Sequence, residues 1–313
     1  MSLETLSRRS APHRLRASLV ALAMAMSVSI LVSAASQQPA AGQQPAPAAP
    51  QPPRTPRATA PLDLTGYWVS VVTEDWRWRM LTPPKGDAPG VPLSLEGRKA
   101  ADAWDLAKDN AAGNQCKAYG AGGITRIPGR IHITWENDNT LRLDYDAGKQ
   151  TRTVHMLSGP GIGGGLLAEV LASKPAQATL QGYSVGRWQL RDEGAPTLNE
   201  ETAATAARGR GAGAPQKGSL KVVTTALRSG YFRKNGLTYG DNAMLTEYYD
   251  RHDDFGSAWF TVLTALDDPK YLASPFVTTT HFKREADGSK WNPQPCETLP
   301  PTINFPSKGE GVG

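Results

Sequence analysis

The stretch that decides the fold is RIHITWENDNTLRLDYDAGKQTRTVHML, residues Arg130–Leu157. Three runs within it are rich in β-branched and aromatic residues and alternate apolar with polar positions, which is typical of strands with one buried face. These runs are Arg130–Trp135, Thr140–Asp144 and Thr151–Leu157. The segments between them, Glu136–Asn139 and Asp146–Gly148, contain residue types that favour tight turns. The stretch therefore predicts a three-strand meander.

The same alternation continues on both sides of this meander. Six further strands are expected, namely Tyr67–Thr73, Tyr183–Leu190, Ser219–Leu227, Met244–Arg251, Ala258–Leu266 and Phe276–Lys283. Many strands with hairpin-sized connections favour an antiparallel sheet that closes on itself or packs as a sandwich. The sequence predicts a single all-β domain over residues 62–300, built on a closed barrel or a strongly curved sheet.

Two kinds of segment interrupt the strand pattern. One helix is expected over Leu93–Asn110, with Ser94 as its N-cap. Gly159–Lys174 begins with glycines and continues as an apolar run, for which a short helix and a long loop are both open. Asp192–Gly218 is rich in Gly, Ala and Arg and is predicted to be a flexible insertion.

The first 34 residues have the layout of a secretory signal. Arg8 and Arg9 belong to a positively charged start. Leu19–Val32 is an apolar run too short to span a bilayer, and cleavage is expected after Ala34. We therefore expect a periplasmic or secreted protein without a stable membrane anchor after cleavage. The general and twin-arginine export routes both remain open.

The rest of the composition describes a nearly neutral domain with unstructured ends. Residues 35–61 are mostly Pro, Ala and Gln without aromatic residues, which predicts a disordered linker, and residues 301–313 are expected to form a disordered tail. Six of the 34 basic residues and one of the 29 acidic residues precede Leu62, leaving 28 of each in the remainder. No basic stripe is concentrated in the domain, so nucleic acid is not expected as a partner.

The chain has two cysteines, Cys116 and Cys296. In an oxidising compartment we expect a disulfide between them, with two separate thiols as the alternative. The bond would hold the C-terminal segment against the first third of the chain. Neither cysteine has a nearby Cys or His at a spacing typical of zinc sites, and no metal or cofactor is predicted.

Five sequence blocks occur in a recognisable order. They are Asp63–Trp68, Gln181–Trp188, Leu220–Thr225, Thr246–Tyr249 and Asp267–Phe276. This order resembles a group of exported bacterial β proteins of unassigned function, with blocks of the form L-T-G-x-W, G-x-S-V-G-x-W and D-D-P-x-x-Y. The resemblance covers Asp63–Trp291 and implies no catalytic residues.

Gly66-Tyr67-Trp68 also resembles the G-x-W signature of lipocalin-type barrels. In those barrels the glycine allows a bend and the tryptophan plugs the closed end. This resemblance implies a lipocalin-like antiparallel barrel with one helix and long loops.

Tryptophan and arginine alternate in Trp76-Arg77-Trp78-Arg79. In a strand, Trp76 and Trp78 would share one face while Arg77 and Arg79 would share the other. Such a pair of faces could bind a flat apolar ligand with an anionic group. Packing of the two tryptophans in the core is the alternative.

Two histidines lie within predicted strands, His155 and His281. If either faced the barrel interior, it could act as a general base beside Asp144 or Glu247. A structural role for each histidine is the alternative.

Three functions from different classes remain open. The first is an exported protein that holds a small apolar or aromatic ligand in a barrel cavity, with Trp76, Arg77, Trp78, Arg79 and His155 as binding residues. The second is a periplasmic hydrolase or isomerase that uses a histidine–carboxylate pair in the same cavity. The third is a surface interaction module. The ligand and the oligomeric state do not follow from the sequence.

Overall fold

The computed structural model describes residues 54–159, 165–173, 175, 177–191 and 217–298. They belong to one compact unit, Pro52–Gly313, whereas the unit Met1–Gln51 lies outside the described residues. The described chain is mostly β, and nine strands form a closed barrel. In order around the barrel they are β1 (Gly66–Val71), β11 (Phe276–Arg284), β10 (Ser257–Asp267), β9 (Met244–Asp254), β6 (Lys217–Thr225), β5 (Tyr183–Arg191), β4 (Gln150–Met156), β3 (Thr140–Tyr145) and β2 (Arg130–Asn137).

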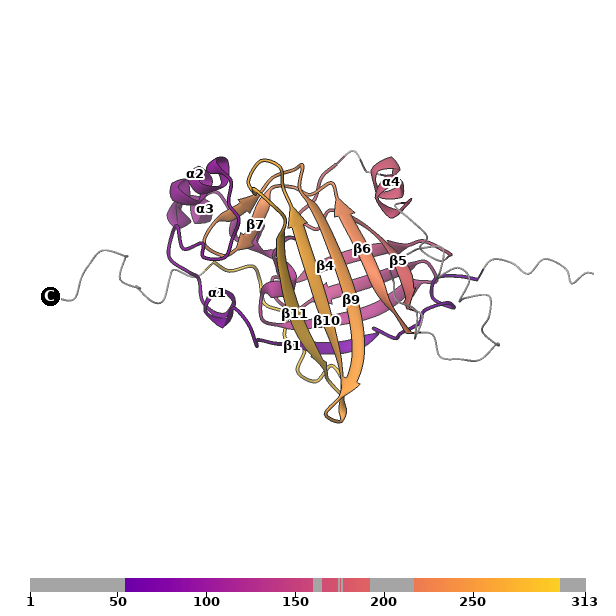
Figure 1. Cartoon of the computed structure of the whole chain (residues 1–313). Coiled ribbons are helices and arrows are strands. Elements are labelled where there is room, and N and C mark those ends of the chain that lie inside the picture. The colour runs from indigo at the N-terminus through magenta and orange to yellow at the C-terminus, as the bar shows by residue number, and fades with distance from the viewer. Residues whose placement is uncertain (1–53, 160–164, 174, 176, 192–216, 299–313) are drawn as a thin grey trace, which may run out of the picture. The chain divides into compact units, whose positions relative to one another are not determined.

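Each of the nine predicted strands coincides with one strand of the barrel, so the prediction of a closed, mostly β domain is confirmed. Figure 1 shows β11, β10, β9 and β6 side by side as one wall. The prediction missed a separate two-stranded sheet of β7 (Gly230–Arg233) and β8 (Leu237–Tyr239). The turn between these two strands contains Asn235 and Gly236, and Gly236 has φ of +79°.

The antiparallel prediction holds for every barrel pair except β4 and β5. These two strands run parallel, with Val154 opposite Ser184 and Met156 opposite Gly186. A parallel pair needs a crossover connection rather than a hairpin. Here the crossover is the chain between residues 157 and 182, which carries helix α4 (Gly165–Ala172).

The prediction of a single helix is wrong. Besides α4, the described chain contains α1 (Trp76–Met80), α2 (Leu95–Ala103) and α3 (Leu106–Ala111), with 3-10 turns η1 (Gln115–Tyr119) and η2 (Ile124–Arg126). Ser94 caps α2 as expected, because its hydroxyl accepts a hydrogen bond from the Gly97 N–H at 3.0 Å. The expected single helix is interrupted at Trp104, and Asp105 caps α3 through the N–H groups of Ala107 and Lys108.

Inward-facing side chains pack closely inside the barrel. Trp68 is fully buried, and its ring meets that of Phe260 edge-on at 4.8 Å between centroids. Phe260 in turn stacks on Phe282 at 4.7 Å. The Trp68 indole N–H donates to the Leu64 carbonyl at 2.9 Å, so the buried polar group is satisfied. Gly66 has φ of +111°, which favours glycine and permits the bend before Trp68.

A second cluster of buried side chains lies beside the barrel core. Its members come from α2, from the β7–β8 sheet, from the ends of β9, β10 and β11 and from the segments between them, and include Leu93, Ala101, Leu227, Phe232, Leu237, Tyr239, Leu245 and Phe276. Figure 1 shows α2, α3 and β7 close together. Trp104 packs directly against Gly236, where any Cβ atom would collide with the indole ring. This contact ties the α2–α3 junction to the β7–β8 hairpin.

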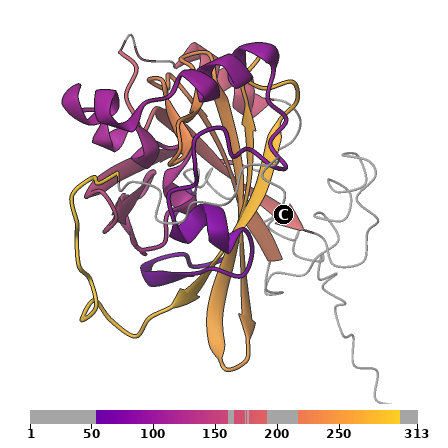
Figure 2. The same ribbon diagram turned by 90° about the vertical axis from the view of Figure 1, so that its left-hand side faces the viewer.

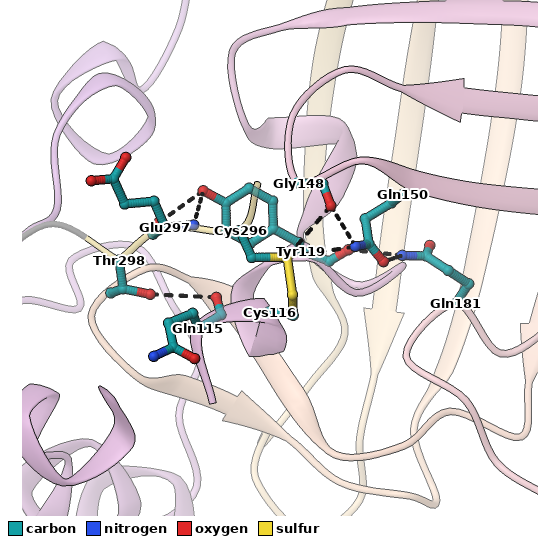
Figure 3. The surroundings of a disulfide bond; sticks show 9 residues. All are labelled: Gln115, Cys116, Tyr119, Gly148, Gln150, Gln181, Cys296, Glu297 and Thr298. Atoms are coloured by element: carbon teal, nitrogen blue, oxygen red, sulfur yellow. Dashed lines mark hydrogen bonds between the residues drawn. A yellow bond between two sulfur atoms is a disulfide. The ribbon is translucent and has the colours of Figure 1, made fainter. Parts of the chain in front are cut away.

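The predicted disulfide between Cys116 and Cys296 is confirmed. Figure 3 shows how hydrogen bonds fix the C-terminal segment beside it. The Tyr119 hydroxyl donates to the Glu297 carbonyl at 2.8 Å, and the Thr298 hydroxyl donates to the Gln115 carbonyl at 3.4 Å. The segment after β11 is therefore held against η1 both covalently and by polar contacts.

Several predicted features fall outside the described residues. They are the signal segment 1–34, residues 35–53 of the linker, the glycines at 160–164, residues 192–216 of the insertion and the tail from 299 onward. Part of the predicted linker is described, and the Trp188 indole N–H donates to the Pro56 carbonyl at 2.8 Å. Among the described residues, no helix is long and apolar enough to cross a membrane.

Candidate functional site

A cleft of about 470 Å³ lies beside the first residues of strand β11, which extend past the end of strand β1. Pairing between the two strands stops at Val71 and His281, whereas β11 begins at Phe276. The first half of β11 therefore has no β1 partner, and α1 lies near this opening. Figure 2 shows the described chain from the side on which α1 lies. The cleft is lined by Glu74, Asp75, Trp78, Pro89, Gly90, Arg233, Phe276, Val277, Thr278 and Thr279.

Trp76-Arg77-Trp78-Arg79 forms part of α1, so the prediction of a strand with two alternating faces is wrong. Asp75 adopts a left-handed conformation with φ of 50°. Its carbonyl accepts from the N–H groups of Trp78 at 2.9 Å and Arg79 at 3.0 Å, which closes a helical turn. Trp76 is consequently 59% exposed, whereas Trp78 lines the cleft.

Two of the arginines in α1 form ion pairs around the cleft. The Arg77 guanidinium lies 3.1 Å from a carboxylate oxygen of Asp87, which also accepts from the Trp78 indole N–H. Arg79 is buried, and its Nη1 donates to Glu74 at 2.9 Å. These contacts fix the position of Trp78 and bring the Glu74 carboxylate to the cleft wall.

A third arginine, Arg126 from η2, closes the inner side of this region. Its Nη2 pairs with the Asp75 carboxylate at 2.5 Å, and its Nη1 donates to the Thr279 carbonyl at 3.1 Å. The second bond satisfies a carbonyl at the edge of β11 that no strand covers. Arg126 thus holds α1 and the open edge of the barrel together.

Arg233, at the end of β7, is buried and has no carboxylate at ion-pair distance among the described residues. It is 6% exposed, and its Cζ lies 4.9 Å from the Trp78 ring centroid and 5.6 Å from that of Phe276. Its Nη2 donates to the Pro89 carbonyl at 3.2 Å, but Nε and Nη1 have no hydrogen-bond partner in the described chain. Burial lowers the Arg233 pKa to about 10, which still leaves the group charged at neutral pH.

Sequence reasoning did not identify Arg233. A signal was present, because Asn235-Gly236 between short apolar runs is typical of a β-hairpin. That pattern predicts the hairpin but not which side chain reaches the cleft, since the cleft is built from segments far apart in the sequence. Arg233 and Glu74 are more than one hundred residues apart, yet both line it.

His155, one of the two histidines considered for the barrel interior, faces outward. The side chain is exposed on the outer face of β4, where its ring stacks on Tyr183 at 4.9 Å between centroids. It neither lines the cleft nor pairs with the acids predicted for it. Its neighbours in β4, Val154 and Met156, are the residues that point inward.

His281 does form a histidine–carboxylate pair, but on the outer face of the barrel. Its Nε2 lies 3.7 Å from Glu74, and its Nδ1 lies 2.9 Å from the Thr261 hydroxyl. The partners named from the sequence are used elsewhere. Asp144 accepts from Arg142 at 2.8 Å, and Glu247 pairs with a buried arginine inside the barrel.

That buried arginine is Arg152, at the centre of a polar network inside the barrel. Its Nη2 pairs with Glu247 at 2.5 Å and donates to the Thr224 hydroxyl at 2.6 Å. Its Nε donates to the Ser184 hydroxyl at 2.9 Å. Burial tends to lower the Arg152 pKa, but the Glu247 charge reverses this effect and the net shift is upward. Side chains thus already occupy the inward positions where a ligand cavity was predicted.

No protein-family model matches the chain, and no curated protein or solved structure matches it either. Within the described residues, no group of three His, Cys, Asp or Glu side chains is placed to hold a metal ion.

Proposed function

We propose that this chain is an exported protein that binds a small, largely apolar or aromatic molecule in the cleft beside β11. The cleft volume of about 470 Å³ supports this, because ligand pockets typically enclose roughly 300–1,000 Å³. The observation that carries the proposal is the pairing of aromatic surface with one under-satisfied polar group. Trp78 and Phe276 supply the surface, and Arg233 supplies the polar group.

The barrel interior supports the proposal less well than the cleft does. Trp68, Phe260 and Phe282 pack against one another there, and the Arg152 network occupies further inward positions. The cleft instead has an open strand edge. On this edge the Thr279 carbonyl accepts from Arg126, and the residues from Phe276 to Thr280 have no partner in β1. Backbone groups of this kind orient ligands in many pockets.

Export is supported by two independent features. The sequence begins with the pattern of a secretory signal. The disulfide between Cys116 and Cys296 is the kind of bond that persists in the periplasm or outside the cell. Together they favour an extracytoplasmic site of action.

Tryptophan fluorescence tests the ligand site. The mature chain is titrated with naphthalene, indole and quinoline derivatives, and the same compounds are added to Trp78→Phe. The matched control is Trp76→Phe, two residues away in the same helix but 59% exposed. We expect quenching in the native protein and in the control, and a clear loss of that signal in Trp78→Phe. Absence of quenching by every compound, or equal quenching in all three proteins, contradicts the proposal.

A second candidate function is hydrolysis, favoured by the contacts of His281. A histidine between a hydroxyl and a carboxylate is an arrangement that can activate the hydroxyl as a nucleophile. The test is turnover of p-nitrophenyl acetate by the native protein and by His281→Gln, with His252→Gln as the control on the exposed part of β9. Equal turnover in all three proteins, or none above buffer, rejects this candidate.

A further inference from the structure

We infer that the bound molecule carries a single carboxylate, and that Arg233 is the residue that binds it. This inference rests on the proposed function, because it specifies the ligand of the same cleft. It specifies that the apolar or aromatic ligand also carries a carboxylate group. It also assigns a role to Arg233, which lies outside the tryptophan–arginine segment of α1.

The first argument is the missing partner of Arg233. A charged group that is 94% buried normally has a counter-charge or a full set of hydrogen bonds. Arg233 has one hydrogen bond, to Pro89, and no carboxylate pairs with it in the part of the chain that the structure describes. The two aromatic rings that flank it stabilise a cation but do not replace an anion. The Nε and Nη1 donors of Arg233 are themselves buried, and the guanidinium has no anion at hydrogen-bonding distance in the described chain.

The second argument is the charge balance around the cleft. Three nearby arginines each have a carboxylate partner, namely Arg77 with Asp87, Arg79 with Glu74 and Arg126 with Asp75. Among the four arginines of this region, Arg233 is the one for which no ion pair within 4.0 Å is found in the described chain. The balance therefore leaves room for one negative charge from the ligand.

The third argument concerns the kind of anion. Glu74 and Asp75 line the same cleft, so a phosphate with two charges meets repulsion that a monoanion meets only in part. A carboxylate is also planar, and it matches the planar donor fork of a guanidinium better than a compact charge does. A monocarboxylate therefore fits the cleft better than a phosphate.

The fourth argument is that Arg233 is held in place before any ligand arrives. The hairpin turn after it is fixed by Asn235, whose amide donates to the carbonyls of Pro84 at 2.9 Å and Asp87 at 3.0 Å. Trp78 and Phe276 flank the guanidinium. A preorganised donor loses little conformational entropy on binding, which favours affinity.

A bound water molecule is the alternative partner for the free Nε and Nη1 donors of Arg233. A cavity of about 20 Å³ behind Arg233 is lined by Trp78, Arg126, Phe232 and Lys234 among others. That volume suits one water molecule, since a site of roughly 10–15 Å³ is sufficient. If water satisfied both donors of Arg233, the charge of the ligand would not matter for binding.

The experiment compares probes that share a naphthalene ring and differ only in the polar group attached to it. The probes are 2-naphthoate, 2-naphthamide and 2-naphthyl phosphate, and each is titrated into the mature chain by calorimetry and ligand-observed NMR. The variants are Arg233→Met and Arg233→Lys. The matched control is Arg284→Met, which also removes an arginine stacked on a tryptophan, here Trp68, outside the cleft.

We expect the native protein and Arg284→Met to bind naphthoate at least about tenfold more tightly than naphthamide, because a charge-assisted hydrogen bond is lost with the amide. Naphthyl phosphate should bind more weakly than naphthoate. In Arg233→Met the preference for carboxylate should disappear while naphthamide still binds. Arg233→Lys should retain part of the preference, because it keeps the charge but loses the fork.

The outcomes separate the two proposals. Equal binding of naphthoate and naphthamide to the native protein overturns the carboxylate inference but leaves the cleft as a ligand site. Tighter binding of the phosphate overturns the choice of a monocarboxylate. No binding of any probe overturns both. If Arg233→Met does not fold, as judged by its thermal transition, the Arg233→Lys result decides the role of this residue.

Discussion

Two buried arginines, Arg152 inside the barrel and Arg233 at the cleft, differ in how many polar partners the fold gives them. Arg152, inside the barrel, is 1% exposed and meets Glu247, Ser184 and Thr224. Arg233, at the cleft, is 6% exposed and has one hydrogen bond within the described chain, to the Pro89 carbonyl. The first arginine thus forms a direct ion pair within the fold, whereas the second has no carboxylate at ion-pair distance among the described residues.

The two environments move the arginine pKa values in opposite directions. Burial favours the neutral form of both, but Glu247 more than compensates for Arg152, whose pKa rises. For Arg233 burial dominates. The nearby carboxylates of Asp75 and Asp87 raise its pKa and Arg126 lowers it, and the net pKa falls to about 10. The charge inside the barrel is therefore balanced within the fold, and the lowered pKa of Arg233 is consistent with the proposal that this residue binds the carboxylate of a ligand.

The largest effect is expected inside the barrel. Glu247→Gln leaves Arg152 buried without its counter-charge, and breaking such a pair costs about 3–5 kcal/mol of unfolding free energy. Urea unfolding followed by circular dichroism measures it. The double variant Arg152→Met/Glu247→Leu should lose less than Glu247→Gln alone. A loss under about 1 kcal/mol in the single variant would mean that the pair is not electrostatically coupled.

The disulfide should change stability without changing the cleft. Cys116 and Cys296 are 180 residues apart, and removing a native disulfide of this kind costs about 2–5 kcal/mol. The variant Cys116→Ser/Cys296→Ser is unfolded in urea beside the native protein. At temperatures where the variant is folded, its affinity for naphthoate should match the native value. A loss of affinity in the folded variant would show that the C-terminal segment contributes to the site.

The arginines of the cleft should differ in what their removal costs. Arg126→Met removes a bond to Asp75 and one to the Thr279 carbonyl, so we expect a loss of about 1.5–3 kcal/mol. Arg233→Met removes a buried charge without a counter-charge, so stability should stay within about 1 kcal/mol of the native value. Thermal unfolding compares the two. Equal losses would contradict the claim that Arg233 lacks a partner.

The smallest effect is expected from an ion pair on the outer face of the barrel. Burial raises the Asp144 pKa, but hydrogen bonds from Arg142 and Thr151 outweigh it, and the net pKa lies below its ordinary value of 3.8. A carboxyl with a lowered folded-state pKa stabilises the fold above the unfolded-state pKa, and loses that effect as pH falls through the folded-state value. The advantage of the native protein over Asp144→Asn should be about 0.5–1 kcal/mol at pH 6 and disappear near pH 2. An advantage that does not change with pH would contradict this assignment.

The strands of the barrel were predictable because alternation over six or more residues is a local signal. The runs around Ile131, Leu141 and Val154 each place apolar residues on one face. Trp76–Arg79 shows the limit of the same rule. Four alternating residues fit a strand and a helical turn alike, and the deciding feature is the left-handed backbone of Asp75, which the pattern does not reveal.

The sequence contains a signal for the β4–β5 crossover and for the disulfide, but none for the environment of Arg233. The apolar run around Leu166 allowed a helix between two strands, and a connection of this kind is what the parallel pairing of β4 and β5 needs. The disulfide was predictable, since a chain with two cysteines has one way to pair them within itself. The lack of an ion pair at Arg233 in the described chain was not predictable, because it depends on which acids pair with Arg77, Arg79 and Arg126.

The measurement that tests the central claim most directly is NMR of the arginine Nε–H groups in isotopically labelled protein, with the Arg233 signal assigned by its loss in Arg233→Met. Addition of 2-naphthoate should shift the Arg233 signal strongly and leave that of Arg152 unchanged, and 2-naphthamide should cause little shift. An Arg233 signal that ignores naphthoate, or that responds equally to the amide, would contradict the account.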